Sequence, residues 1–345
     1  MLNRINFISV IVVAISALVV FFIGRYSVGK QTSPAYQPGK TVTADTIVNY
    51  PYTNPILHCI DPRKIDMREL KTFKKEINLY IANAIKISPD LHVSFYFRDL
   101  NNGITIGVNE KELFSPASLM KVPVLISVLK AAENKPDLLG TRIQYIKSNF
   151  SGIDEESGFP KIDKEYYTVD EYLKHMIVYS DNAATLLLAK FIGINNILRT
   201  EKELNLNHAS DANSQTNFVS VLRYAAVFRI LFNASFLNKS MSDKALQLLT
   251  QVKYNDGIRA AVPAQYSLAH KYGERDVFDE KGKRNTLQLH HFGIVYYTGK
   301  PYIIGVMTRG GNRMLKEKII KDLAEITFKA VDLQMKSDEK AVFND

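Results

Sequence analysis

Cysteine is almost absent from this sequence of 345 residues, since Cys59 is the only one. A single cysteine excludes an intramolecular disulfide and a cysteine-based zinc finger. The seven histidines lack HExxH or comparable spacing, so neither a metal nor another cofactor is expected. The net charge is +9, but no basic run is interleaved with aromatic residues. Nucleic-acid binding is therefore not expected.

Long apolar runs are also scarce. Hydrophobic residues make up 46% and charged residues 23% of the chain, which excludes a mainly disordered, collagen-like or polytopic membrane protein. The exception is FISVIVVAISALVVFFI at 7–23, which is flanked by Arg4 and Arg25 and is just long enough to cross a bilayer core. We expect residues 1–25 to be a transmembrane anchor. A cleaved signal peptide is the alternative, although no small-residue cleavage site follows closely.

The remaining chain divides into a linker and one folded domain. Residues 26–61 are rich in Pro, Thr, Ser, Gln and Tyr without helical periodicity, which is typical of a tether. Residues 62–340 alternate between helical and strand patterns. Helices are expected at 65–87, within 115–252 and at 314–335, and strands at 92–100, 104–109, 267–272, 288–297 and 302–308. This order predicts an α+β fold: an antiparallel five-stranded sheet flanked by helices, with an inserted all-helical subdomain.

Ser118 and Lys121 lie three positions apart at the start of a strongly apolar helix. Ser115 can be its N-cap and Pro116 its first residue. The serine Oγ and lysine Nζ then share a face, where a neutral amine could accept the serine proton. The Ser118 N–H would be one of the free donors at a helix N-terminus, which favours an oxyanion. A capped helix with a solvated lysine is the alternative.

Two further motifs follow, Ser180-Asp181-Asn182 and Lys271-Tyr272-Gly273. The first lies between two helices and can present a proton relay and an amide to a substrate. It can also simply cap the helix that begins at Ala183. The second ends a strand, where a lysine can hold a carboxylate and the strand edge can supply an N–H.

In this order the three motifs resemble those of class A β-lactamases and related penicillin-binding proteins. Their flanks are similar too, as in FSPASLMKVPVL and HHFGIVYYTGKPYIIGVMTRG, and the resemblance covers residues 65–335. It implies a β-lactamase-like fold and a serine hydrolase. The implied substrates are β-lactams or related D-Ala-D-Ala wall peptides, which would acylate Ser118.

The resemblance also implies roles for the other motif residues. Lys121 would be the proton partner of Ser118, and Ser180 would relay a proton to the leaving nitrogen. The implied substrate-binding residues are Asn182, Lys271, Tyr272, Gly273 and Glu274. Backbone N–H groups of Ser118 and Glu274 would form the oxyanion hole.

Two positions of the third-motif region depart from the family pattern. Tyr272 stands where Thr or Ser is normal, and its bulky ring cannot place a hydroxyl at the same point. Phe292 stands where many class A enzymes carry an arginine, and it follows His290 and His291. One of these histidines could contact a substrate carboxylate, but we expect a solvated pair.

A third departure concerns hydrolysis. The run from Glu201 to Asn205 has the letters of the family loop whose glutamate activates the deacylating water. It lies only 21 residues after Ser180 and continues a helix from Asn195. We therefore expect Glu201 to be an exposed helix charge. Deacylation would then be slow, as in a D,D-peptidase or penicillin-binding protein. A catalytically impaired, tethered binding protein on the same fold is a further alternative.

The apolar run predicts localisation at a membrane, with the domain outside the cytoplasm. Full-length protein should fractionate with membranes, and removal of residues 1–30 should release a soluble domain with folded circular dichroism. Full-length protein in the soluble fraction with an intact N-terminus would contradict the anchor. A mature chain that begins after Gly24 would indicate a signal peptide instead.

Overall fold

The structure is a computed structural model that describes residues 51–53, 67–150, 162–206, 218–278 and 284–342. The expected anchor, and Cys59 with nearly all of the linker, lie outside these ranges. Within them, no helix combines the length and the apolar character needed to cross a membrane. The anchor therefore stays a prediction.

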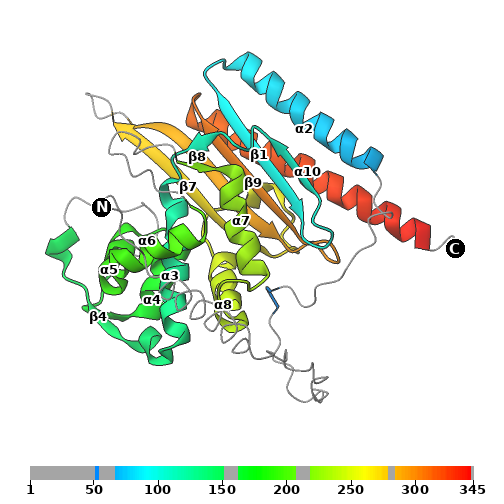
Figure 1. The fold of residues 1–345 in the computed structure, drawn as a ribbon. Helices are drawn as coiled ribbons and strands as arrows, with labels where there is room; N and C mark the ends of the chain where they lie inside the picture. Colours follow the sequence, from blue (N-terminus) through cyan, green and yellow to red (C-terminus); the bar gives the residue numbers. More distant parts are fainter. Residues whose placement is uncertain (1–50, 54–66, 151–161, 207–217, 279–283, 343–345) are drawn as a thin grey trace, which may run out of the picture. The chain divides into compact units, whose positions relative to one another are not determined.

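The predicted five-stranded antiparallel sheet is confirmed (Figure 1). Its strand order is β2-β1-β9-β8-β7, and every neighbouring pair is antiparallel. The strands are β1 (His92–Asp99), β2 (Thr105–Val108), β7 (Leu268–Phe278), β8 (Arg284–Val295) and β9 (Tyr302–Arg309). The expected end of β7 at residue 272 is wrong, because pairing with β8 continues through the polar residues that follow. Gly273 therefore lies within an edge strand.

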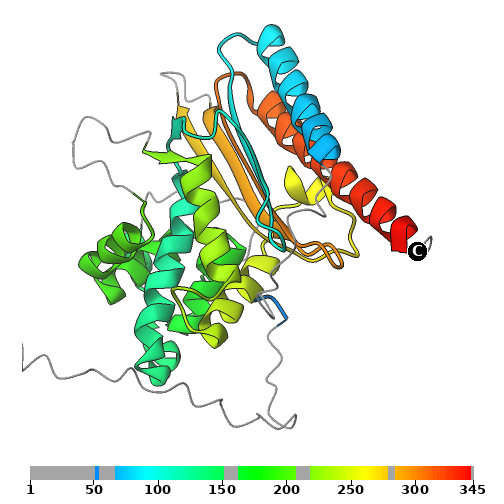
Figure 2. The ribbon, with the colours of Figure 1, turned by 45° about the vertical axis from the view of Figure 1, so that its right-hand side comes forward.

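Helices cover both faces of the sheet (Figures 1 and 2). The terminal helices α2 (Met67–Ile87) and α10 (Arg313–Val342) pack together on one face, with the short α9 (Ile258–Ala261) beside them. The other face is covered by helices from the inserted segment between β2 and residue 250. Its helices are α3 (Lys121–Glu133), α4 (Val169–Val178), α5 (Asn182–Ile192), α6 (Ile194–Glu203), α7 (Val221–Phe232) and α8 (Lys239–Thr250), with 3-10 turns η3 (Ala117–Met120), η4 (Pro136–Gly140) and η5 (Lys147–Phe150).

The inserted segment is not wholly helical, which corrects the expectation. Two short antiparallel ribbons join its helices: β3 (Leu113–Phe114) with β6 (Val219–Ser220), and β4 (Arg142–Gln144) with β5 (Tyr166–Thr168). These strands are too short to show an alternating hydrophobic pattern. The ribbon of β3 matters for the site, because it leads directly to Ser118.

Alternating strand residues divide the interior into two cores. On β9, Ile303 and Met307 face the inserted segment, whereas Ile304 and Val306 face α2 and α10. This follows from the two-residue period of a strand, since successive side chains point to opposite faces. Burial of both faces explains why β9 reads as a nearly continuous apolar run. The sheet is therefore packed on both faces, and the inserted segment is positioned against one of them.

The contact of Gly305 on β9 with Phe292 on β8 tests how closely the centre of the sheet is packed. A methyl group at Gly305 would lie 2.2 Å from the Phe292 ring, which Tyr224 and Phe228 hold at centroid distances of 4.6 and 6.4 Å. Gly305→Ala should therefore lower the free energy of unfolding by about 1–3 kcal/mol in urea denaturation. Gly140→Ala, where a methyl group meets nothing within 4 Å, should change it by less than about 0.5 kcal/mol. Equal stability of the two variants would contradict this packing.

Candidate active site

The serine of the first motif lies in a 3-10 turn rather than in the first turn of an α-helix. Ala117–Met120 form η3, and α3 begins at Lys121. No side chain caps this start, so the expected Ser115 N-cap is wrong. Ala117 has a φ of 49°, a left-handed conformation that residues with a Cβ rarely adopt. The chain therefore turns sharply just before Ser118.

Lys121 connects the first motif with the second. Its Nζ lies 3.0 Å from Ser118 Oγ, which confirms that the two side chains share a face. The same amine contacts Asn182 Oδ1 at 2.8 Å and Ser180 Oγ at 3.1 Å, and it also donates to the Ser180 carbonyl. Lys121 is only 4% exposed, so the alternative of a solvated lysine is excluded.

The second motif forms the turn between α4 and α5. Asp181 is the N-cap of α5, and its Oδ1 accepts the Ala184 N–H at 2.8 Å. Ser180 has a φ of 58°, which turns its carbonyl and hydroxyl together towards Lys121. Asp181 thus caps the helix, while Ser180 and Asn182 contact Lys121, so both alternatives for this motif apply.

The third motif brings a second amine to the same serine. Lys271 Nζ lies 2.9 Å from Ser180 Oγ, and its side chain is fully buried. Two residues further on, a methyl group at Gly273 would lie 2.6 Å from the Pro116 carbonyl oxygen. Only glycine allows β7 to lie so close to the turn that carries Ser118. The structure therefore brings all three motifs together.

Tyr272 and Glu274 flank this glycine. Tyr272 is 3% exposed and stacks on Tyr254, with ring centroids 4.0 Å apart and planes at 15°. Lys271 Nζ lies 4.3 Å from the Tyr272 ring centroid. Tyr272 is therefore packed beside the lysine that it follows. The Glu274 carboxylate pairs with Arg313 at 2.9 Å.

The expectation of a solvated histidine pair is wrong, because His290 and His291 are fully buried. Desolvation lowers the pKa of His290 to about 4 and the pKa of His291 well below its usual value, so both rings are neutral at neutral pH. His291 Nδ1 accepts the Ile258 N–H at 3.1 Å. Phe292 is also fully buried. No side chain of this stretch is exposed to replace the arginine found at this position in the family.

The expectation for Glu201 is also wrong, because its side chain is only 4% exposed. It shares the buried face of α6 with Ile197 and Leu204, and α6 packs against α3. The helix then ends in a Schellman motif, with Asn205 at a φ of 57° and the Leu206 N–H bonded to the Glu201 carbonyl at 2.8 Å. The expectation assumed that a buried glutamate needs a separate loop, but here it belongs to the helix itself.

Sequence reasoning missed the residues that hold the serine turn from outside. Tyr224 of α7 donates its hydroxyl to the Leu119 carbonyl at 2.6 Å. Its side chain is fully buried, and desolvation raises its pKa well above the ordinary value. Gln288 and His290 of β8 bind the main chain of Ser115. In the sequence, the one sign of these contacts was that each residue carries a polar group at a position where the helix or strand faces the protein interior.

Comparison with known proteins identifies the family. A family model described as "Beta-lactamase enzyme family" matches residues 73–331, so the chain belongs to the β-lactamase enzyme family, which supports a serine hydrolase. No curated protein sequence matches the chain.

Solved structures share the fold at low sequence identity. PBP-A is 20% identical with a TM-score of 0.63, over 76% of this chain and 97% of that one. A β-lactamase from Chitinophaga pinensis is 21% identical with a TM-score of 0.65, over 75% and 99%. A class A β-lactamase from Bacteroides cellulosilyticus is 18% identical with a TM-score of 0.64, over 75% and 98%. The β-lactamase-like fold is therefore confirmed.

Proposed function

We propose that this protein is a serine hydrolase of the β-lactamase type, which forms an acyl-enzyme on Ser118 with β-lactams or related D-Ala-D-Ala peptides and then hydrolyses it. The observation that carries this proposal is the meeting of Lys121 and Lys271 at Ser180 Oγ, with Ser118 Oγ beside the first amine. A mutant of PBP-A, which is similar in fold, was solved as an acyl-enzyme complex with penicillin G. That complex supports the choice of ligand.

This geometry supports the acylation of Ser118. A neutral Lys121 amine accepts the Ser118 proton as Oγ attacks the carbonyl carbon. Two amines near one oxygen disfavour a positive charge on both, which favours the neutral form of one of them. The carbonyl C–N bond then breaks. Ser180 accepts hydrogen bonds from both amines with its lone pairs, so its O–H can donate a proton to the leaving nitrogen. Ser180 Oγ takes a proton from the Lys121 ammonium group in the same step, which returns Lys121 to the neutral amine.

Substrate binding is assigned to the edge of β7 and to the second motif. The Tyr272 carbonyl accepts Lys271 Nζ at 3.1 Å, and the Glu274 N–H lies along the same strand edge because backbone groups alternate in direction. The N–H groups of Glu274 and Ser118 would stabilise the oxyanion. Lys271 would attract the substrate carboxylate, and Asn182 would bind the substrate amide.

Deacylation is assigned to Glu201. The Glu201 side chain is buried although desolvation of a charge is costly, and carboxylates in such surroundings are common among catalytic bases. Glu201 lies on the face of α6 that packs against α3, the helix that follows Ser118. We assign it as the general base that activates the deacylating water. A D,D-peptidase with slow deacylation is the competing function, which the variants below distinguish.

Ser118→Ala should abolish covalent labelling by a fluorescent penicillin while the protein remains folded. Alanine is tolerated in a helical turn, and Ser118 Oγ lies 3.0 Å from the Lys121 amine that would accept its proton. The measurement is intact-protein mass spectrometry with circular dichroism as the folding control. Equal acylation of variant and parent would show that Ser118 is not the nucleophile.

Glu201→Gln should slow deacylation by about 10²-fold or more, the upper range for a positioned general base, while acylation changes little. The variant should then accumulate a stable acyl-enzyme in single-turnover mass spectrometry. Glu203→Gln is the matched control, because Glu203 lies on the same helix and is exposed. If the parent itself retains the label and Glu201→Gln changes deacylation less than about twofold, the protein is a slow D,D-peptidase or penicillin-binding protein.

A further inference from the structure

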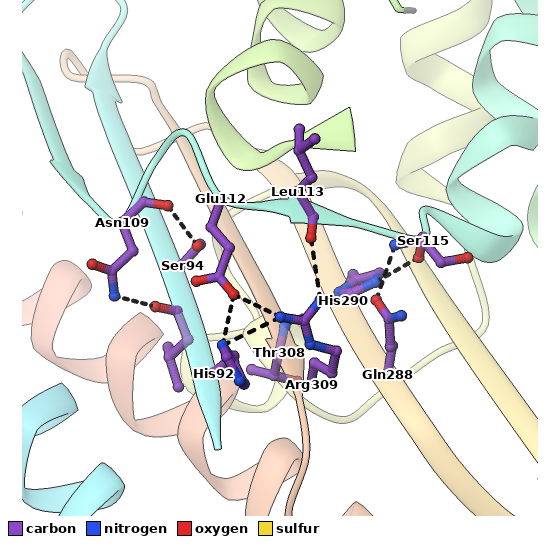
Figure 3. A network of polar contacts seen from close by, with 11 residues as sticks. His92, Ser94, Asn109, Glu112, Leu113, Ser115, Gln288, His290, Thr308 and Arg309 are labelled. Atoms are coloured by element: carbon purple, nitrogen blue, oxygen red, sulfur yellow. Dashed lines mark hydrogen bonds and ion pairs between the residues drawn. The ribbon is translucent and has the colours of Figure 1, made fainter. Parts of the chain in front are cut away.

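The chain segment that leads to Ser118 is bound to the sheet through side chains (Figure 3). The Ser115 N–H donates to Gln288 Oε1 at 3.0 Å, and His290 Nε2 lies 2.8 Å from the Ser115 carbonyl oxygen. Both partners lie on β8 and point to the same face of the sheet. Both polar atoms of one main-chain residue are thus held by neighbouring inward positions of one strand.

The proton positions on His290 follow from its two partners. The Thr308 N–H can only donate, so Nδ1, which it approaches at 3.2 Å, must be an acceptor. The Ser115 carbonyl can only accept, so Nε2 must carry the proton. The Thr308 N–H on β9 therefore favours the tautomer that donates to Ser115. The low pKa that burial gives His290 is consistent with this neutral form.

Gly273, which lies beside His290 on the adjacent strand, contacts the next residue of the segment, Pro116. His290 is the register partner of Gly273, so the two positions face the same side of adjacent strands. Gly273 lies against the Pro116 carbonyl, while His290 binds the carbonyl of Ser115. Beyond Pro116 the chain adopts the left-handed conformation of Ala117. A backbone of this kind persists only where its surroundings over-determine it.

We propose that His290 and Gln288 are positioning residues for acylation: by holding the Ser115 main chain they set the left-handed turn at Ala117 and with it the direction of the Ser118 N–H and Oγ. This rests on the proposed function of Ser118. Both residues bind the main chain of Ser115, three positions before Ser118. They act through the main chain, on the geometry that oxyanion stabilisation requires.

Further contacts hold residues 112 and 113, which precede Ser115, but these contacts are more exposed than those of Ser115 itself. Glu112 pairs with Arg309 at 2.9 Å and with His92 at 2.7 Å, and Arg309 Nη1 lies 3.4 Å from the Leu113 carbonyl (Figure 3). These side chains are 26% to 47% exposed, and exposed ion pairs contribute little to stability. The contacts of β8 with Ser115 are buried. They are therefore the ones that can hold the turn.

The test measures the acylation rate constant and the non-covalent dissociation constant separately, by stopped-flow kinetics with a fluorescent penicillin. His290→Leu removes both ring contacts, whereas His290→Gln restores an N–H donor near the position of Nε2. Gln288→Met removes the acceptor of the Ser115 N–H and guards against misfolding of the leucine variant. His291→Leu is the matched control, because His291 has the same burial on the same strand but faces away from Ser115.

We expect His290→Leu and Gln288→Met to lower the acylation rate constant by about 10- to 100-fold, below the loss for deleting an oxyanion donor outright. The dissociation constant should change less than about threefold. His290→Gln should recover to within about fivefold of the parent. His291→Leu should lose comparable thermal stability and keep the parent rate. Parent-like acylation in His290→Leu, or equal losses in His291→Leu, would overturn the proposal.

Amide hydrogen exchange separates this proposal from the proposed function. His290→Leu should accelerate exchange in peptides that span 114–120, and His291→Leu should not. If the parent is never labelled by penicillin, the proposed function fails, and the positioning role then depends on this exchange alone. Unchanged exchange at 114–120 in His290→Leu would refute the positioning role whatever the parent does with penicillin.

Discussion

Two buried lysine amines meet at the hydroxyl of Ser180, and the surrounding structure is arranged to keep them there. Removing an ammonium group from water costs several kcal/mol unless its donors are satisfied. Here the acceptors are the Ser180 hydroxyl and carbonyl, Asn182 Oδ1 and the Tyr272 carbonyl. Two of these depend on the left-handed backbone of Ser180, which itself costs about 1–3 kcal/mol. The two apolar cores on either side of the sheet supply the stability that offsets this.

The site also requires that three separate elements approach one another closely. Strand β7 must lie against η3, which Gly273 permits, and α5 must begin where Asp181 caps it. Tyr224 and the side chains of β8 then hold the main chain on both sides of Ser118. Local strain at Ala117 and Ser180 is thereby fixed by contacts that come from distant parts of the sequence. This is the arrangement expected where a folded chain stores strain at a functional site.

Local features of this protein could be predicted from the sequence, and long-range ones could not. The Ser118–Lys121 contact follows from helical spacing. The three-residue spacing of Thr168 and Glu171 likewise favours the capping box that they form, with hydrogen bonds of 3.1 and 2.7 Å. Meanwhile Glu201 and His290 were expected to be exposed because charged and polar residues usually are. Their burial depends on how α6 packs on α3 and how β8 faces the serine turn. Neither contact leaves a periodic signal in the sequence.

The two departures from the family pattern in the third-motif region belong to one packing arrangement. Phe292 is the register partner of Lys271, and its ring contacts Tyr224, whose hydroxyl binds the carbonyl of Leu119 beside Ser118. At a position that carries an arginine in many class A enzymes, Phe292 therefore packs against the tyrosine that holds η3, the turn that contains Ser118. Tyr272 meanwhile packs its ring against Lys271 and Tyr254. In the proposed reaction, Lys271 then carries the positive charge that attracts a substrate carboxylate. Its amine is also hydrogen-bonded to Ser180, the proposed proton relay. Carboxylate binding and proton transfer therefore involve the same hydrogen-bonded pair of residues.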